Sequence, residues 1–197
     1  MKTRLSESAF TGLEAAIVLI AFVVVAAVFS YVILGAGFFT SQKSQEVVQT
    51  GIQEASSSLQ VIGGVYGMQN GSNPSLGYVK FTVGNTAGGT ALDVSKMVIS
   101  YQDGTTRWSN LTYQSGYTVS GDSLMNAPEW GINQTANDVG TQNTLLEPGE
   151  QFILVVGVPV SATVNTPITI NLQPSNGAVF QIKRAVPAAI TPVNILY

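Results

Sequence analysis

Residues 15–39 read AAIVLIAFVVVAAVFSYVILGAGFF, and no charged residue occurs between Ala15 and Gln42. As an α-helix, a stretch of this length spans about 38 Å, enough to cross a bilayer core of about 30 Å. Apolar residues surround this helix on every side, which excludes an amphipathic helix lying on a surface. A buried core helix is a weaker interpretation, because few chains of 197 residues could enclose it. The stretch therefore predicts a helix that needs lipid or copies of itself.

The flank before this helix indicates how it is inserted. Residues 1–9 carry Lys2 and Arg4, and positive charge keeps a flank in the cytoplasm while the remainder crosses. An ordinary secretory signal has an apolar region of only about 7–15 residues, followed by small residues at its cleavage site. Gly35-Ala36-Gly37 resembles such a site, but the apolar stretch before it is too long. We therefore expect a membrane-inserted precursor.

The flank after the helix continues with helical spacing. Apolar residues recur at intervals of 4, 3, 4 and 3, and charged and amide side chains fill the other faces. These apolar residues are Val48, Ile52, Ala55, Leu59 and Ile62. Gly63-Gly64 supplies a stop. We predict one helix from about Phe10 to Ile62, within an assembly segment 10–63, whose stripe docks against the chain's own β domain or adjacent helices.

The rest of the chain predicts a β domain. Residues 64–77, which end in MQNGSNPSLG, read as a turn-rich linker. In residues 78–197 the period changes to two, which predicts about seven short strands of an antiparallel β-sandwich. The strand candidates are 78–83, 97–101, 107–113, 116–120, 151–158, 167–172 and 178–182. Residues 122–143 are expected to form a long loop. The predicted class is α+β, with a hydrophobic N-terminal helix before the sandwich.

Composition excludes most enzyme classes and a basic nucleic-acid interface. Only 10% of residues are charged, the net charge is −3, and 61 of 197 residues are Ser, Thr, Asn or Gln. Without Cys or His, thiolate and imidazole ligands and the commonest general base are absent. Glu147 and Glu150 flank a turn and fit either paired carboxylates, an oxygen-ligand cation site or, as we favour, solvated turn residues. We expect no catalysis, no metal and no cofactor.

Three N-glycosylation sequons follow the helix, at Asn70, Asn110 and Asn133. Composition alone produces about two matches in such a chain, so their number indicates nothing. Their location is more informative, because all three lie near turns in the part expected outside the membrane. As glycan acceptors, Asn110 and Asn133 rank above Asn70, because Asn70 is nearest the helix and we expect the assembled filament to shield it.

Residues 10–38, FTGLEAAIVLIAFVVVAAVFSYVILGAGF, closely resemble the archaeal flagellins, or archaellins. The resemblance is strong over residues 8–62 and weaker at Leu146–Ile153, LEPGEQFI. It implies a type IV pilin-like precursor whose leader, residues 1–9, is cut between Ala9 and Phe10 by a prepilin-type leader peptidase. An assembly motor then packs many copies, with helices at the filament centre and Ig-like β domains outside.

Beyond the resemblance, the charge and apolar pattern of the helix predicts roles for individual residues. Glu14 is expected to pair with the new α-amino group of Phe10, on its own chain or a neighbour's, or else to cap the helix N-terminus. The residues expected in the helical core of the assembly are Leu13, Ile17, Ile20, Val24, Val28 and Val32. The implied function is a structural subunit of the archaeal motility filament at the cell surface. Two alternatives stay open: an adhesive archaeal pilin and a membrane-anchored surface domain that never polymerises.

Overall fold

The computed structural model describes residues 3–56, 59–85, 91–116, 119–124, 126–138 and 140–197, without the side chains of residues 3–11 and 53–56. The predicted residues Ala9, Phe10 and Ala55 therefore have a described backbone only, and the predicted strand 116–120 lies partly outside the described residues. Two compact units form the chain, Met1–Thr50 and Gly51–Tyr197.

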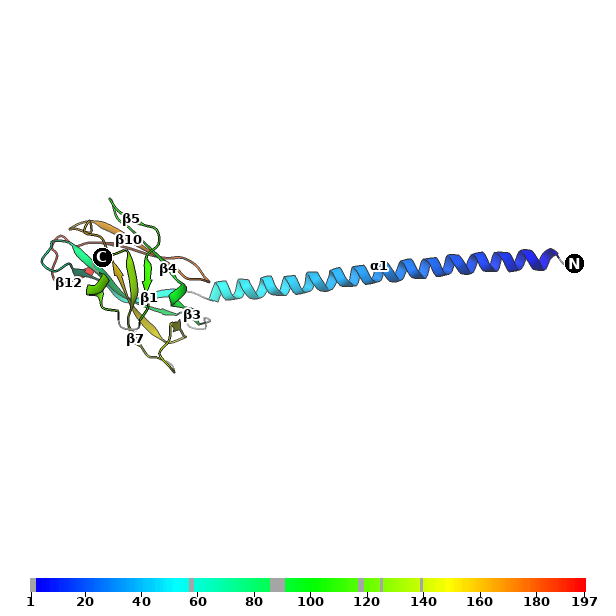
Figure 1. Ribbon diagram of the computed structural model, residues 1–197, viewed down its shortest axis with the longest axis horizontal. Helices are drawn as coiled ribbons and strands as arrows, with labels where there is room; N and C mark the ends of the chain where they lie inside the picture. Colours follow the sequence, from blue (N-terminus) through cyan, green and yellow to red (C-terminus); the bar gives the residue numbers. More distant parts are fainter. Residues whose placement is uncertain (1–2, 57–58, 86–90, 117–118, 125, 139) are drawn as a thin grey trace. The chain divides into compact units, whose positions relative to one another are not determined.

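The first unit belongs to one continuous helix, α1 (Thr3–Ser56), of 54 residues (Figure 1). At 1.5 Å per residue this helix is about 80 Å long. Its interior contains no proline, and two of its threonines donate hydrogen bonds to carbonyl oxygens four residues earlier. These are Thr40 Oγ1 to the Ala36 oxygen (2.8 Å) and Thr50 Oγ1 to the Glu46 oxygen (2.9 Å). The predicted long apolar helix is confirmed.

The predicted end of the helix at Ile62 is wrong. Strand β1 (Leu59–Gln69) follows α1 and runs through Gly63-Gly64 without stopping there. Leu59 is buried in the hydrophobic core and pairs with Asn85 of the next strand. Gly63 has a φ of +78°, and the pairing register shifts between Ile62 and Tyr66, so the glycines form a bulge. The predicted helical stripe is thus divided between a helix and a strand, and residues 64–77 are largely strand instead of linker.

The second unit contains two main sheets and one small one (Figure 1). The larger sheet has the order β12-β1-β2-β9-β7-β6 and the other has the order β11-β10-β4-β5. All described pairs are antiparallel except β6 with β7. The remaining bounds are β2 (Leu76–Asn85), β3 (Leu92–Asp93), η1 (Val94–Lys96), β4 (Val98–Gln102), β5 (Arg107–Trp108), β6 (Thr112–Gln114), η2 (Gly121–Leu124), β7 (Glu129–Ala136), β8 (Leu145–Leu146), β9 (Gln151–Gly157), β10 (Pro167–Gln173), β11 (Phe180–Ala185) and β12 (Val193–Leu196).

Both main sheets contribute their inner faces to a single hydrophobic core, as in a β-sandwich. The alternation read from the sequence is confirmed in three strands or their flanks, whose apolar residues are buried. These are Val79, Phe81 and Val83; Met97, Ile99 and Tyr101; and Ile168, Ile170 and Leu172. We call this unit the head. Burial of alternate apolar side chains is what positions the remaining side chains of each strand outward.

The long loop predicted at residues 122–143 is also wrong. This segment contains part of η2 and the whole of β7, which lies between β6 and β9 in the larger sheet. Trp130 and Ile132 of β7 are fully buried. A register shift between Ile132 and Gln134 breaks the alternation after only two apolar residues, which explains why the sequence pattern is weak here.

Candidate assembly surface

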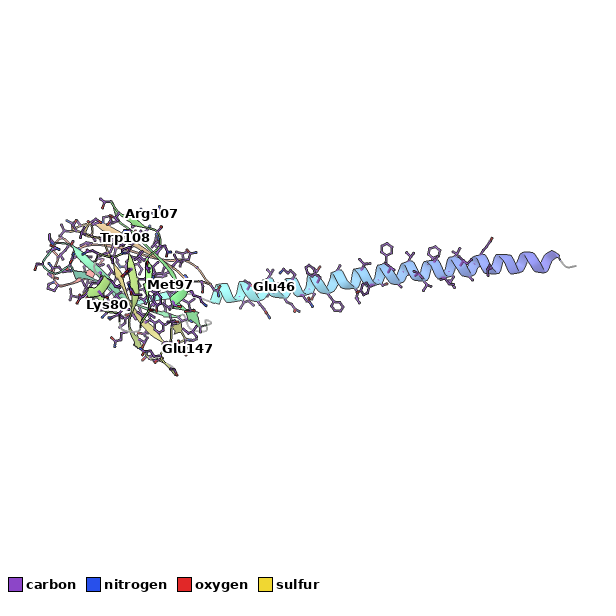
Figure 2. All side chains as sticks on the ribbon, in the orientation of Figure 1. Glu46, Lys80, Met97, Arg107, Trp108 and Glu147 are labelled. Carbon is purple, nitrogen blue, oxygen red and sulfur yellow. The ribbon has the colours of Figure 1, made fainter. Side chains whose placement is uncertain are left out.

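The helix surface is apolar and exposed all around. No side chain between Gly12 and Ile52 is buried within the described chain. Twenty large apolar side chains of this segment are exposed, from 52% for Val25 to 81% for Tyr31. The six residues predicted for the assembly core are all among them: Leu13, Ile17, Ile20, Val24, Val28 and Val32. Side chains project from α1 on both sides of the view in Figure 2.

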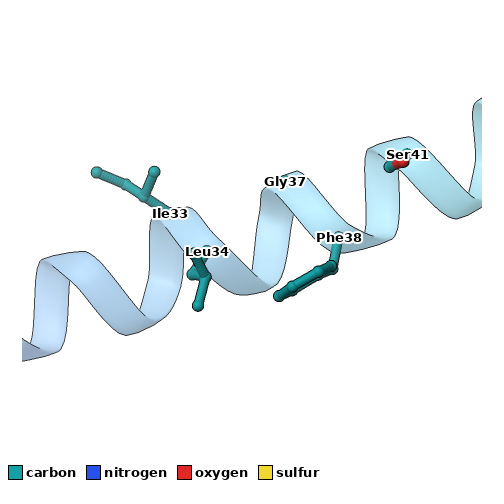
Figure 3. A pocket seen from close by; sticks show the side chains of 5 residues that line it. All are labelled: Ile33, Leu34, Gly37, Phe38 and Ser41. Atoms are coloured by element: carbon teal, nitrogen blue, oxygen red, sulfur yellow. The ribbon is translucent and has the colours of Figure 1, made fainter.

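A hollow lies in this apolar surface at Gly37 (Figure 3). Ile33, Gly37 and Ser41 form one row along the helix, and Leu34 and Phe38 form the neighbouring row. A Cβ atom at Gly37 would meet nothing within 4 Å, so the absent side chain leaves an open hollow of about 330 Å³. Small residues at such positions allow another helix to approach closely.

The charged residues of the helix lie near the ends of the apolar stretch. Lys43 directly follows the uncharged stretch, its Nζ lies 2.6 Å from Glu46 Oε2, and both side chains are exposed. Glu14 is exposed well inside α1, which begins at Thr3. In the uncut chain Phe10 is an internal residue and has no free α-amino group. The predicted pairing of Glu14, like its predicted capping role, therefore requires the cut form.

The three sequons have different surroundings in the head. Asn110 is exposed between β5 and β6. Asn70 is half-buried at the turn after β1, where its backbone N–H donates to the Ser75 oxygen (3.0 Å). Asn133 is half-buried in β7, and its Nδ2, the atom that a glycan would modify, donates to the Val119 oxygen (3.0 Å). The geometry favours Asn110 and disfavours Asn133, contrary to the rank that the sequence suggested for Asn133.

Glu147 and Glu150 form a turn rather than a pair of reactive carboxylates. Glu150 is buried, and its Oε2 accepts a hydrogen bond from the backbone N–H of Glu147 (3.0 Å). Within the described residues, no group of three or more acidic side chains could hold a metal ion. The sequence interpretation of both residues as solvated was wrong for Glu150, whose side chain instead closes the turn before β9.

Five described hydrogen bonds converge on the carboxylate of Asp103, which lies in the turn between β4 and β5. Its Oδ1 accepts from the N–H groups of Thr105 (2.7 Å) and Thr106 (2.6 Å) and from the Thr105 hydroxyl (3.0 Å). Its Oδ2 accepts from the hydroxyls of Tyr101 (3.0 Å) and Ser161 (2.5 Å). This arrangement joins the β4–β5 hairpin to the connection between β9 and β10.

Opposing effects set the pKa of Asp103. Burial raises the pKa of its carboxyl, but hydrogen bonds from Ser161, Thr106, Thr105 and Tyr101 outweigh burial and leave the pKa below its ordinary value. Burial and the neighbouring Asp103 carboxylate raise the pKa of Tyr101. Tyr101 therefore remains a hydrogen-bond donor at neutral pH. The sequence Asp-Gly-Thr-Thr signals the local turn, but not the contact with Ser161.

These features define a class of protein: a filament-type subunit with one exposed apolar helix and a β-sandwich head. The comparisons with known proteins agree. The profile of archaeal-type flagellins matches residues 9–184. Probable flagellin 1 of Archaeoglobus fulgidus is 38% identical over 200 residues, which cover 97% of this chain and 96% of that protein.

Solved structures give the same result. The archaeal flagellum of Methanospirillum hungatei strain JF1 has a TM-score of 0.70 and 30% identity, covering 94% of this chain and 99% of that one. The fold is also similar to the crystal structure of archaeal flagellin FlaB1 from Methanocaldococcus jannaschii, with a TM-score of 0.60 over 71% of this chain and 96% of that one. At 18% identity, this second similarity supports the fold alone. The chain belongs to the archaeal-type flagellin family. It is a structural subunit of the extracellular archaeal motility filament, the archaellum, and it self-assembles.

Proposed function

We propose that α1 is the element through which this subunit polymerises. The observation that carries the proposal is the uniformly exposed apolar surface between Gly12 and Ile52. Full burial of one large apolar side chain contributes about 1.5–3 kcal/mol. Twenty such side chains are exposed on this segment, so their burial contributes tens of kcal/mol per subunit before the entropy of ordering is subtracted. When the subunit is outside the membrane, packing α1 against copies of itself removes this apolar surface from water.

The same surface explains storage of the subunit before assembly. The uncharged stretch between Ala15 and Gln42 is long enough to cross a bilayer as a helix. Lys2 and Arg4 favour a cytoplasmic N-terminus, and Lys43 and Glu46 begin the polar part on the other side. We place the leader cut between Ala9 and Phe10, made by a prepilin-type leader peptidase. An assembly motor then transfers the cut subunit from membrane to filament.

Two local features of α1 are assigned roles in this packing. The hollow at Gly37 admits a side chain of a neighbouring helix between Ile33 and Phe38. Glu14 is a carboxylate within the buried apolar bundle, and an unpaired buried charge costs several kcal/mol. The α-amino group created at Phe10 by the leader cut supplies the pairing cation.

In the head, Asn110 is the preferred acceptor of a glycan because its side chain is exposed.

The experiment compares matched variants in cells that produce filaments. Val28→Asp places a carboxylate in the middle of the proposed helical bundle, and Gly37→Leu fills the hollow. The control, Gln102→Asp, adds the same charge to an exposed position of β4 in the head. Filaments are sheared, pelleted and weighed, the membrane-bound precursor is measured by immunoblot, and the N-terminus of the filament protein is determined by mass spectrometry.

We expect Val28→Asp to abolish filaments and Gly37→Leu to weaken them, while Gln102→Asp assembles normally. All three variants should insert, since one charge in an otherwise apolar helix costs about 2.5–3.5 kcal/mol on insertion scales. The filament protein should begin at Phe10. Normal filaments from Val28→Asp would show that α1 does not polymerise the subunit, and an intact Met1 in filaments would exclude the leader cut.

A further inference from the structure

Glycine directly follows asparagine or aspartate at three places in the chain. These are Asn70-Gly71, Asp103-Gly104 and Asn176-Gly177. All three glycines lie in the head, at turns or bends where glycine is favoured. Because glycine has no Cβ atom, its backbone nitrogen can approach the carbonyl carbon of the preceding side chain closely. Attack of that nitrogen on that carbon would close a cyclic imide, and the structure distinguishes which pair is free to react.

The Asp103 side chain is held too firmly to react. Burial raises the pKa of its carboxyl, but its hydrogen bonds outweigh burial and leave the pKa below its ordinary value, so the group is ionised at neutral pH. An ionised carboxylate is a poor electrophile, because attack on its carbon would have to expel an oxide ion. Five hydrogen bonds also fix its two oxygens, from Tyr101, Ser161, Thr105 and Thr106. This pair is therefore protected.

The backbone around Asn70 is fixed by hydrogen bonds. The N–H of Gly71, whose nitrogen would have to attack, donates to the Gln69 carbonyl oxygen (3.1 Å). The N–H of Asn70 donates to the Ser75 oxygen (3.0 Å), and its carbonyl oxygen accepts from the Asn73 N–H (2.9 Å). Asn70 is also half-buried. The Gly71 nitrogen can turn toward the side chain only when this turn opens, so the reaction at Asn70 depends on local unfolding.

The third pair, Asn176-Gly177, has none of these restraints. It lies in the connection between β10 and β11, beyond their last paired residues, Leu172 and Phe180. Asn176 is exposed, and within the described part of the chain neither its side-chain amide nor the Gly177 N–H makes a hydrogen bond. Gly177 has a φ of +113°, a conformation that favours glycine. Hydrogen bonding therefore restrains neither the nitrogen nor the amide carbon that must meet.

We propose that Asn176 is a site of self-catalysed deamidation, with water as the only co-reactant. The Gly177 backbone nitrogen loses its proton and attacks Cγ of Asn176. The new N–Cγ bond closes the imide, and the bond from Cγ to the side-chain nitrogen breaks to release ammonia. Water then opens the imide at one of two bonds. Cleavage between the Gly177 nitrogen and Cγ gives aspartate, whereas cleavage between this nitrogen and the main-chain carbonyl carbon gives isoaspartate, whose backbone runs through Cγ.

The reaction changes the charge of the head and leaves its sheets paired. Each conversion replaces a neutral amide by a carboxylate, so the formal net charge of the uncut chain falls by one, from −3 to −4. Isoaspartate lengthens the backbone by one carbon, but residues 174–179 lie between the two strands, so the pairing of β10 with β11 is preserved. Because the reaction needs only water, the converted fraction increases with the age of the subunit. The inference does not require polymerisation.

The test compares the two Asn-Gly pairs within one molecule. The full chain is produced in a bacterial host that does not glycosylate sequons, so that Asn70 carries no glycan. It is then incubated in detergent at mildly alkaline pH, either folded or unfolded by guanidinium chloride, in water labelled with heavy oxygen. Peptide mapping by mass spectrometry measures the oxygen incorporated at each asparagine and identifies isoaspartate by its fragments. Asn176→Gln is the matched control, because glutamine keeps the amide but would have to close a larger, less favourable ring.

In the folded chain we expect Asn176 to convert at least about tenfold faster than Asn70, because Asn70 reacts only when its turn opens. In the unfolded chain the two rates should become similar, since both asparagines are then followed by an unrestrained glycine. Asn176→Gln should abolish conversion at its own position and leave Asn70 unchanged. Equal rates in the folded chain, faster conversion of Asn70, or conversion of Asn176 only after unfolding would each overturn the proposal.

Discussion

Replacing Asp103 by alanine should destabilise the head more than any other single change of a surface-loop carboxylate. Five hydrogen bonds converge on this side chain, from Tyr101, Ser161, Thr105 and Thr106. A bond to a charged acceptor contributes about 1.5–3 kcal/mol, and a buried donor left unsatisfied costs about 1–3 kcal/mol. Bonds in one network are not additive, so we expect Asp103→Ala to lower the free energy of unfolding by about 3–5 kcal/mol, less than the sum of the five bonds.

The matched variant Asp103→Asn separates charge from hydrogen bonding. Asparagine keeps one acceptor oxygen for Thr105 and Thr106 and presents an amide toward Tyr101 and Ser161, whose hydroxyl oxygens can accept. We therefore expect a smaller loss than for alanine. Both tryptophans, Trp108 and Trp130, lie in the head, so tryptophan fluorescence during urea unfolding of the full chain in detergent reports on the head. An Asp103→Ala variant within about 0.5 kcal/mol of wild type would refute this reasoning.

The lowered pKa of Asp103 determines how the difference in unfolding free energy between wild type and Asp103→Asn depends on pH. The pKa of Asp103 is lower in the folded head than its ordinary value, which is about 3.9 in an unfolded chain. Its contribution to stability is therefore complete above about pH 4 and is lost as the pH falls through the lower folded pKa. The gap between wild type and Asp103→Asn should narrow on acidification below pH 4. A gap that widens there would contradict the assignment.

Three further predictions concern other parts of the subunit. Leu59 is buried in the core, so Leu59→Ala should lower the free energy of unfolding of the head by about 2–5 kcal/mol. Ile52 lies on α1 instead, so Ile52→Ala should leave the unfolding detected by tryptophan fluorescence unchanged and make filaments easier to break by shear. Equal effects on the head would contradict the assignment of Ile52 to helix packing. Glu14→Gln should reduce the amount of filament per cell without reducing the membrane precursor; wild-type filament yield and stability would show that charge pairing is unnecessary. Asn110→Gln should remove a glycan mass from the filament protein in glycopeptide mapping, and Asn133→Gln should remove none; a bare Asn110 in wild type would contradict this.

Local periodicity was sufficient to predict the elements whose faces are unambiguous. The apolar stretch 15–39 indicated the helix without any tertiary information, because its pattern fits no half-buried element. Alternation at Val79, Phe81 and Val83 correctly predicted which side of β2 faces the core. The apolar stretch and the alternation both depend only on residues close together in the sequence, so both can be read without knowledge of long-range contacts.

The end of the helix could not be predicted in this way. Apolar residues at Leu59 and Ile62 continue the helical spacing, but Leu59 gains more by packing in the core beside β2. The pairing partners of β1 lie in β2 and in β12, at the other end of the chain. Such long-range pairing overrides local propensity. Gly63, read as a helix stop, serves a bulge instead.

Long-range contacts also hid most of the head's polar sites. The turn at Asp103 was visible, but Ser161, which donates to the same carboxylate, is 58 positions away. The strand β7 was missed because its alternation stops after Trp130 and Ile132. The sequons were visible as motifs, yet only the structure shows the amide of Asn133 bonded to Val119. The resemblance of residues 8–62 to the archaellins indicated the function, whereas the roles of individual head residues could not be predicted.

The most direct test of polymerisation through α1 is electron cryo-microscopy of sheared, purified filaments at side-chain resolution. We predict a central bundle of α1 helices from many copies, beginning at Phe10, with Val28 and Gly37 packed against neighbouring helices and the heads outside. A filament in which the heads alone make the contacts, with α1 removed or exposed to solvent, would contradict the account.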